Sequence, residues 1–186
     1  MRILVDMDDV LENMGRALVE SLDFLYGFDV EYEDVKSWDI AGYFPGLTKE
    51  QVFEPLDNPI FWRCIVSPIP RAREVLEQLI SEGHDIYVVT ASHPNTIQSK
   101  IPGFLFKYYP FITLDNVIIT QNKQMISGDV LIDDAPHNLI GGEYKGILFD
   151  APHNSSFDAE SAGIVRAKNW DEIYSILTIM NGGVSK

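Results

Sequence analysis

The chain has 186 residues, of which 28 are Asp or Glu and 14 are Lys or Arg, so its formal net charge is −14 at pH 7. This length suits one domain with a small insertion. Hydrophobic residues make up 46% of the sequence and charged residues 23%, a composition that excludes an intrinsically disordered chain. The acidic balance argues against a nucleic acid polymer as partner, whereas a small phosphorylated ligand fits if a cation lies between it and the protein.

The cysteine count and the lengths of the apolar runs exclude further classes of protein. Cys64 is the single cysteine, so an internal disulfide and a cysteine-based zinc site are excluded, and its apolar neighbours predict a core residue. The sequence has no run of about 18 apolar residues of the kind that spans a membrane. The apolar run at the N-terminus is too short for a signal peptide, so we expect a cytoplasmic protein.

Short apolar runs alternate with longer amphipathic segments along most of the chain. The runs are rich in Val and Ile and lack polar alternation, which is typical of parallel strands covered on both faces. In chain order the predicted elements are strand Ile3–Val5, helix Glu12–Leu25, helix Arg71–Glu82, strand Ile86–Val89, helix Thr96–Tyr108, strands Val117–Ile119, Val130–Ile132 and Ile147–Phe149, and helix Asp171–Met180. Pro102 weakens the third of these helices. The predicted fold is therefore an α/β fold, an open parallel sheet with helices on both faces.

The segment from residue 27 to residue 69 breaks this alternation. It is rich in aromatic residues and turn formers, among them Trp38, Phe61 and Trp62. We interpret it as a small helical cap inserted after the first strand–helix unit. Residues 1–26 and 70–186 then form the core domain, and residues 27–69 form the cap.

Polar side chains follow the predicted strands where each strand ends. In an open parallel sheet, ligands bind beyond the carboxyl ends of the strands. The side chains expected at this edge are Asp6, Asp8 and Asp9 after the first strand, Thr90 and Ser92 after the second, Lys123 after the third, and Asp133 and Asp134 after the fourth. Five carboxylates from two strands would meet there.

Such a cluster needs a cation. Two like charges 4 Å apart repel by about 4 kcal/mol at an effective dielectric constant of about 20, against a total stability of about 5–15 kcal/mol for a typical protein. Oxygen ligands without Cys or His favour Mg²⁺. For Asp9 a second interpretation stays open, because this carboxylate could instead cap the helix that follows it.

Taken in chain order, these residues resemble the four motifs of the haloacid dehalogenase-like phosphohydrolases, and most of all the 5'(3')-deoxyribonucleotidases. The resemblance rests on the segment DMDDVL at residues 6–11, on Thr90, and on the spacing from Lys123 to Asp133 and Asp134. It covers nearly the whole chain and includes the small cap between the first two motifs. Asp8 favours a phosphatase over a dehalogenase, because a dehalogenase has no alkoxide to protonate.

The resemblance implies a role for each motif residue. Asp6 would be the nucleophile that forms an aspartyl-phosphate, and Asp8 would act as general acid and then general base. Mg²⁺ would be held by the Asp6 carboxylate, the Asp8 carbonyl and Asp134, with Asp133 in support. Lys123 would neutralise Asp6 and the substrate oxygens, and the Thr90 hydroxyl would bind a phosphate oxygen.

The residues that bind the rest of the substrate are less clearly marked. By resemblance, Met14 falls at a base-contacting position, and Ser92 replaces a hydroxyl that the nucleotidases carry at Ala91. Trp38, Phe61 and Trp62 are the aromatic candidates for stacking on a base. Lys100, by contrast, is interpreted as a solvated surface lysine, and His84, His137 and His153 are also expected at the surface.

The resulting hypothesis is a Mg²⁺-dependent phosphatase that acts on nucleoside monophosphates, preferably deoxyribonucleotides. A sugar phosphate or another small phosphomonoester is the alternative substrate. A phospho-accepting signalling domain is the alternative of another class, but the third apolar run ends at Thr120 with no Asp close behind it. An exposed aromatic cap could also serve as a contact in a homodimer.

Overall fold

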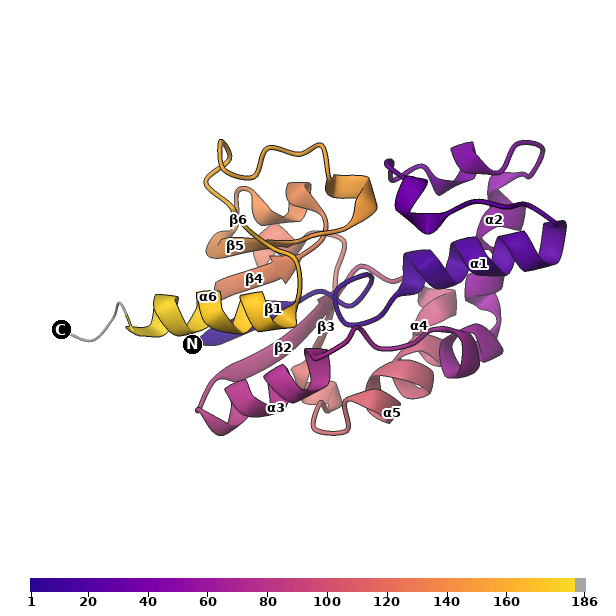
Figure 1. Cartoon of the computed structure of the whole chain (residues 1–186). Helices are drawn as coiled ribbons and strands as arrows, with labels where there is room; N and C mark the ends of the chain where they lie inside the picture. Colours follow the sequence, from indigo (N-terminus) through magenta and orange to yellow (C-terminus); the bar gives the residue numbers. More distant parts are fainter. Residues whose placement is uncertain (183–186) are drawn as a thin grey trace.

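Six strands form one parallel sheet in the order β3-β2-β1-β4-β5-β6 (Figure 1). The computed structural model describes residues 1–182. The strands are β1 (Arg2–Val5), β2 (Asp85–Thr90), β3 (Val117–Ile119), β4 (Ser127–Asp133), β5 (Glu143–Phe149) and β6 (Val165–Ala167). All five predicted strands are confirmed, and the parallel α/β architecture with them.

The helices differ widely in length and type. The α-helices are α1 (Met14–Tyr26), α2 (Lys49–Asp57), α3 (Ala72–Ser81), α4 (Pro94–Lys100), α5 (Phe106–Tyr108) and α6 (Trp170–Gly182). Two π-helical turns are η3 (Phe61–Ile65) and η4 (Ile101–Leu105). The 3₁₀ helices are η1 (Tyr32–Asp34), η2 (Ile40–Tyr43), η5 (Leu114–Asn116), η6 (Lys123–Met125), η7 (Pro136–Leu139) and η8 (Pro152–Asn154). Within residues 1–182, every helix is too short or too polar to cross a membrane.

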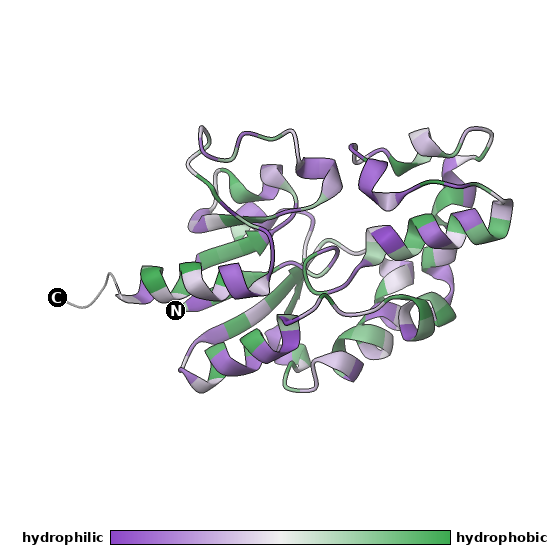
Figure 2. Ribbon diagram, viewed as in Figure 1, coloured by the Kyte–Doolittle hydropathy of each residue, from purple (hydrophilic) through white to green (hydrophobic). Residues whose placement is uncertain are grey.

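Side chains of the strands alternate between two hydrophobic clusters, one on each face of the sheet. In β1, Ile3 and Val5 join the larger cluster, while Leu4 joins the smaller one. Helices α3 and α6 cover the larger cluster, and η7 helps to cover the smaller one. In Figure 2 the strands are mainly hydrophobic, while α3 alternates between hydrophobic and hydrophilic residues, as expected for a helix with one buried face.

Two elements differ from their predictions. The predicted helix Thr96–Tyr108 is divided into α4, the π-turn η4 and α5, and Pro102 lies in the first turn of η4. Strand β6 was missed because its three residues include Arg166, so it makes no apolar run. It is an edge strand whose pairing with β5 is a tertiary contact.

Helices α1, α2 and α4 lie together beyond the carboxyl ends of the strands (Figure 1). Helix α2 begins at a capping box formed by Thr48 and Gln51, which fixes its first turn. Helix α1 contacts α2 and η1. The cap boundary at residues 27–69 stays a prediction, and α1 packs against that segment.

Two expectations about burial are wrong. Cys64 is exposed, because the π-turn η3 buries the neighbouring Phe61 and Trp62 instead. His84 is buried, and its Nδ1 lies 3.1 Å from the amino group of Met1. The exposure of Cys64 and the burial of His84 depend on tertiary packing, which the local sequence does not indicate.

Candidate active site

The predicted acidic edge lies where the strand order reverses around β1. Strand β1 has β2 on one side and β4 on the other, so three carboxyl ends meet there. Asp6 follows β1, Thr90 ends β2, Asp133 ends β4, and Lys123 begins η6 beyond β3. This is the topological position at which open α/β sheets bind their ligands.

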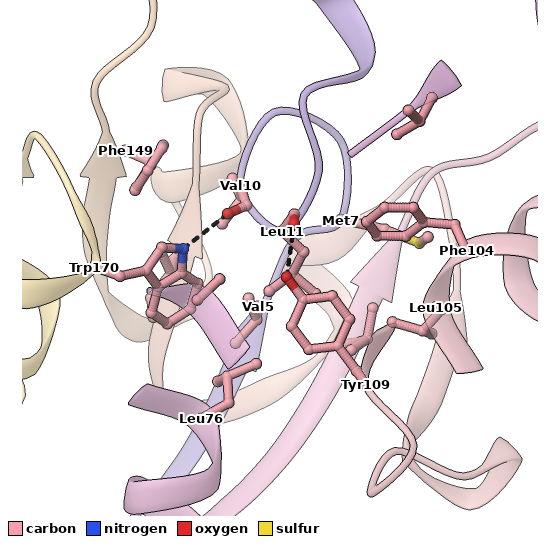
Figure 3. Packing of buried hydrophobic residues seen from close by; sticks show 14 of the residues in the cluster. Val5, Met7, Val10, Leu11, Leu76, Phe104, Leu105, Tyr109, Phe149 and Trp170 are labelled. Atoms are coloured by element: carbon pink, nitrogen blue, oxygen red, sulfur yellow. Dashed lines mark hydrogen bonds between the residues drawn. The ribbon is translucent and has the colours of Figure 1, made fainter. Parts of the chain in front are cut away.

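The loop after β1 is held rigidly by the core. Val10 and Leu11 are fully buried, and both of their carbonyl oxygens accept hydrogen bonds from buried aromatic side chains. Trp170 Nε1 donates to the Val10 carbonyl at 2.9 Å, and the Tyr109 hydroxyl donates to the Leu11 carbonyl at 2.7 Å (Figure 3). These two contacts fix the backbone on which Asp8 and its neighbours project.

Lys123 connects two of the carboxylates. Its Nζ lies 2.6 Å from Asp6 Oδ1 and 2.6 Å from Asp133 Oδ2. Asp133 also accepts hydrogen bonds from the Ala135 amide at 2.8 Å and from the Asn138 side-chain amide. Asp133 is therefore fully occupied by protein donors, whereas Asp6 keeps one oxygen free of Lys123.

The side chain of Asp9 caps the first turn of helix α1, which is the second interpretation of this residue from the sequence. Its Oδ1 accepts the backbone N–H of Gly15 at 2.8 Å. A Cβ at position 15 would come within 2.6 Å of Asp9 Oδ2, so the glycine is needed for this approach. Asp9 has φ +53°, a left-handed conformation that Asp tolerates better than most residues.

Lys100 is not a surface lysine. It is almost fully buried, and its Nζ lies 2.6 Å from Asp8 Oδ1, 2.9 Å from Ser92 Oγ and 3.5 Å from Thr90 Oγ1. The prediction is wrong because Lys100 lies between Ile97 and Ile101, on the apolar side of the segment. That helical spacing was the signal that could have identified it.

Ser92 lies beside Thr90 and Lys100. The hydroxyls of Ser92 and Thr90 are 2.8 Å apart, and both lie within reach of Lys100. A pair of hydroxyls beside an ammonium group is suited to binding the oxygens of an anion.

Glu12 is a site residue that the sequence did not single out. It is fully buried, its Oε1 lies 3.3 Å from Lys100 Nζ, and within residues 1–182 neither carboxylate oxygen has a hydrogen-bond partner. Burial raises the pKa of Glu12 well above its usual value, and the nearby carboxylate of Asp8 adds to this effect. A long-range partner such as Lys100 leaves no signal in the local sequence.

His153 also lies at the site and not at the surface. Its Nε2 is 2.8 Å from Asp134 Oδ2, and its ring packs against Trp38 with 3.9 Å between the ring centroids. Burial lowers the pKa of His153 to about 4. Opposite an ionised Asp134 carboxylate, which can only accept, the neutral imidazole carries its proton on Nε2 and donates it. Of the remaining histidines, His137 is exposed, as expected.

The predicted substrate-binding residues divide into two groups. Trp38 is 51% exposed and contacts His153, while Met14 is half-buried in the first turn of α1. Phe61 and Trp62 are buried and pack edge to face with ring centroids 5.1 Å apart. The ring centroid of Trp62 lies 5.2 Å from Lys100 Nζ, so this ring borders the site. Phe61 instead lines an apolar pocket formed by residues of α1, α2 and η3.

Burial and mutual repulsion shape the protonation of the carboxylates. Burial raises the pKa of Asp6 to about 7 and that of Asp9 to about 7, and it raises the pKa of Asp134 well above its usual value. Burial acts the same way on Asp8, but the ammonium of Lys100 outweighs it and leaves the pKa of Asp8 lowered. The edge therefore holds more carboxylates than its two lysines neutralise.

The donor set fits a divalent cation that prefers oxygen. Asp6, Asp133 and Asp134 offer carboxylate oxygens that all lie within 4.8 Å of one another. Asp133 is occupied by Lys123, Ala135 and Asn138, which leaves Asp6 and Asp134 as the carboxylates of this set that are open to a metal ion. Asp134 also forms a second set of possible ligands with Asp9 and His153. Oxygen ligands of this kind suit Mg²⁺ better than a softer metal.

Comparison with known families agrees with this geometry. Residues 1–181 match the family model described as 5' nucleotidase, deoxy (pyrimidine), cytosolic type C protein (NT5C). A 5'(3')-deoxyribonucleotidase of Bacillus subtilis is 34% identical over 176 residues, which cover 92% of this chain and 95% of that protein. A 5'(3')-deoxyribonucleotidase of Clostridium acetobutylicum is 33% identical over 168 residues, covering 90% and 89%.

Solved structures share the fold at low sequence identity. A haloacid dehalogenase-like protein of unknown function from Agrobacterium tumefaciens superposes with a TM-score of 0.65 at 13% identity, covering 96% of this chain and 98% of that one. A HAD family hydrolase from Deinococcus radiodurans, crystallised with bound phosphate and sodium, gives a TM-score of 0.60 at 16% identity and covers 95% and 94%. These likenesses support the fold that the strand order indicates.

Proposed function

Because the chain belongs to the NT5C family of deoxy (pyrimidine) 5' nucleotidases, and is thus a phosphomonoester hydrolase, we propose that it hydrolyses deoxyribonucleoside monophosphates with Mg²⁺ through an aspartyl-phosphate. One observation carries this proposal. Two carboxylates with different environments, Asp6 and Asp8, stand side by side at the end of β1, each paired with its own buried lysine.

In the first step the free carboxylate oxygen of Asp6 attacks phosphorus, and the bond between phosphorus and the ester oxygen breaks. Lys123 holds the Asp6 carboxylate in place through its other oxygen. Although burial raises it, the ammonium of Lys100 lowers the pKa of Asp8 overall, so Asp8 would take up its proton when the phosphate dianion binds beside it. It would then give that proton to the departing alkoxide of the nucleoside. The nucleoside leaves, and the phosphoryl group remains on Asp6.

In the second step the carboxylate of Asp8 takes a proton from a water molecule. The oxygen of that water attacks phosphorus, and the bond to Asp6 breaks. Inorganic phosphate leaves, Asp6 is regenerated as a carboxylate, and Asp8 is again protonated. The side chain of Asp8 is 30% exposed and can exchange protons with water, whereas that of Asp6 is 9% exposed.

The phosphoryl oxygens are bound by groups from the end of β2, from α4 and from η6. Thr90 and Ser92 offer hydroxyls, and Lys100 and Lys123 offer ammonium groups. Such preorganised donors stabilise the charge of the transition state more than that of the substrate.

Asp6, Asp134 and the backbone carbonyl of Asp8 would hold Mg²⁺, with Asp133 supporting Lys123 behind them. When bound, the ion compensates the charge on the phosphoryl oxygens. Without it, the buried carboxylates would repel a phosphate dianion.

The base of the nucleotide would bind toward the proposed cap at residues 27–69. Trp38 supports this placement because its ring is half exposed at the junction with the acidic edge. Aromatic rings stack well on planar bases. The homodimer contact predicted for the aromatic cap stays a prediction, and Trp38 and Phe53 are aromatic residues of that segment whose side chains are exposed.

Phosphate release in the presence of Mg²⁺ tests the proposal with dUMP, dTMP, UMP, 3'-dUMP, AMP and several sugar phosphates. We expect the deoxyribonucleotides to be hydrolysed fastest and Asp6→Asn to show no turnover on any of them. If only sugar phosphates are hydrolysed, the mechanism with two carboxylates would still hold, but nucleotides would not be the substrate. Activity that persists in EDTA would reject the metal.

A further inference from the structure

We propose that His153 is a positioning residue that orients Asp134 toward the metal and couples this orientation to the cap through Trp38. This inference rests on the proposed function, since it needs Mg²⁺ at Asp134. It assigns a role to a histidine that lies outside the four motifs. One imidazole ring makes both contacts: its Nε2 faces Asp134, and its ring face packs against Trp38.

Asp134 is held at two points by the loop that contains η8. The side-chain amide of Asn154 donates to the backbone carbonyl of Asp134 at 2.8 Å, and His153 Nε2 donates to its Oδ2 at 2.8 Å. Within the described part of the chain, His153 is the hydrogen-bond donor to this carboxylate. The adjacent Asp133, in contrast, has three partners of its own. The hydrogen bond to His153 is therefore the contact that can orient the Asp134 carboxylate within the described part of the chain.

The loop that carries His153 is itself fixed. Asn154 donates a second hydrogen bond, to the Phe149 carbonyl at 2.8 Å. Arg166 donates to Asn154 Oδ1 at 2.8 Å and to the Phe157 carbonyl at 2.8 Å. The His153 side chain is only 6% exposed. The imidazole is thus an anchored group, able to impose an orientation on a carboxylate next to it.

The face of the same ring meets the segment predicted to be the cap. Trp38 lies between η1 and η2, and its ring centroid is 3.9 Å from that of His153, with an angle of 49° between the planes. His137 is a more distant neighbour of the same indole, at 6.4 Å. A displacement of Trp38, for example when a base binds, would therefore press on the ring that holds Asp134.

Carboxylates that bind metals are commonly oriented by a hydrogen bond from outside the coordination shell. Removal of such a partner typically lowers metal affinity or activity about 10- to 100-fold. The bond from His153 to Asp134 has the geometry of such a partner. The packing of Trp38 on this ring extends the connection from the metal ligand to the substrate-binding surface.

Two substitutions separate the nitrogen from the ring face. His153→Gln keeps an N–H donor near the position of Nε2 but removes the aromatic face, whereas His153→Phe keeps the face but removes the donor. Mg²⁺ binding to metal-free protein is measured by calorimetry, and the KM for dUMP is measured separately. We expect His153→Phe to raise the dissociation constant for Mg²⁺ about tenfold or more, and His153→Gln to leave it within about threefold of wild type. Conversely, His153→Gln should raise the KM more than His153→Phe does.

A matched control is His137→Phe, which alters the other histidine beside Trp38 and should leave Mg²⁺ binding unchanged. The coupling is tested by Trp38→Leu, which should weaken Mg²⁺ binding about threefold in the wild-type background and not at all in His153→Phe. Thermal melting of each metal-free variant checks that it is folded.

The outcomes are distinguishable. If wild-type protein binds no Mg²⁺, the metal of the proposed function and this inference fail together. If wild type binds Mg²⁺ and His153→Phe binds it equally well, the inference alone is overturned. If His153→Phe is weakened but Trp38→Leu is not, the positioning role stands and the coupling to the cap is rejected.

Discussion

The acidic edge of the sheet and the segment at residues 27–69 are built in opposite ways. At the edge, most side chains are buried and held by partners that are themselves anchored, as Lys123 is held between Asp6 and Asp133. The 27–69 segment consists of short 3₁₀ and π-helical turns around one α-helix, and Trp38 and Ile60 are more than half exposed.

This difference has a physical reason. Phosphoryl transfer depends on donors that are already in place before the transition state forms, so the edge has to be rigid. Recognition of a base depends on apolar contact, which an adaptable and partly exposed surface can supply. In the function proposed here, the edge carries the chemistry and the 27–69 segment determines specificity.

The largest expected effect comes from Asp6→Asn at the edge. The amide is a poor nucleophile, so turnover should fall by more than about 10³-fold. The fold should remain, because removing one buried charge relieves repulsion by Asp133 and Asp8. Phosphate release and circular dichroism measure the two properties. Near-normal turnover would show that Asp6 is not the nucleophile.

The next largest effect should come from Lys100→Met. It removes an ammonium from the proposed phosphate-binding groups, and it leaves the partly exposed Asp8 and the buried Glu12 without their cation, so turnover should fall about 100-fold and the melting temperature should drop. Lys107→Met is the matched control, because Lys107 lies seven residues further along the chain but is exposed. If the two variants behave alike in kinetics and melting, the buried lysine has no special role.

An intermediate effect is expected from pH in the absence of metal. Burial raises the pKa of Asp6 and of Asp9 from 3.8 to about 7 in the folded protein. Their contribution to stability is full below the unfolded value and is lost as pH rises through about 7, because the unfolded chain releases its protons earlier. In EDTA the melting temperature should thus fall between about pH 5 and pH 7.5. Mg²⁺ at the upper pH should restore it, and a flat profile would contradict the charge balance described for the edge.

The smallest effect should come from the 27–69 segment itself. Trp38→Leu should raise the KM for dUMP several-fold, because an exposed aromatic contact of this kind contributes about 0.5–1.5 kcal/mol. It should change the turnover number by less than about twofold, since Trp38 touches none of the groups that transfer protons or phosphate. Steady-state kinetics at saturating Mg²⁺ test this prediction. A loss of turnover comparable to that of Lys100→Met would erase the distinction between the two regions.

Residues at strand ends were predictable because two local signals coincide there. An apolar run such as Ile3–Val5 marks a buried parallel strand, and a polar residue directly after it must lie at the carboxyl edge. The same reasoning located Thr90, Lys123 and Asp133 without any knowledge of their partners. It also located Asp9, whose capping bond to Gly15 spans only six residues.

Residues whose environment depends on distant partners were not predictable in this way. Lys100 is 92 positions away from Asp8, and His153 is 19 positions away from Asp134. Read locally, each is a polar residue in a helix or loop, for which exposure is the usual outcome. Strand β6 was not predictable for the same reason, because it is defined by its pairing with β5 and not by an apolar run.

The sequence by itself determined the α/β sheet, the carboxylates and Lys123 at its edge, and the family to which the chain belongs. These depend on short-range periodicity and on the spacing of residues that carry the chemistry. The tertiary structure alone decided that Lys100 and Glu12 are buried beside Asp8, and that His153 joins Asp134 to Trp38. A charged or polar side chain is buried only where a partner compensates for its lost hydration, and in these cases the partner comes from a distant part of the chain.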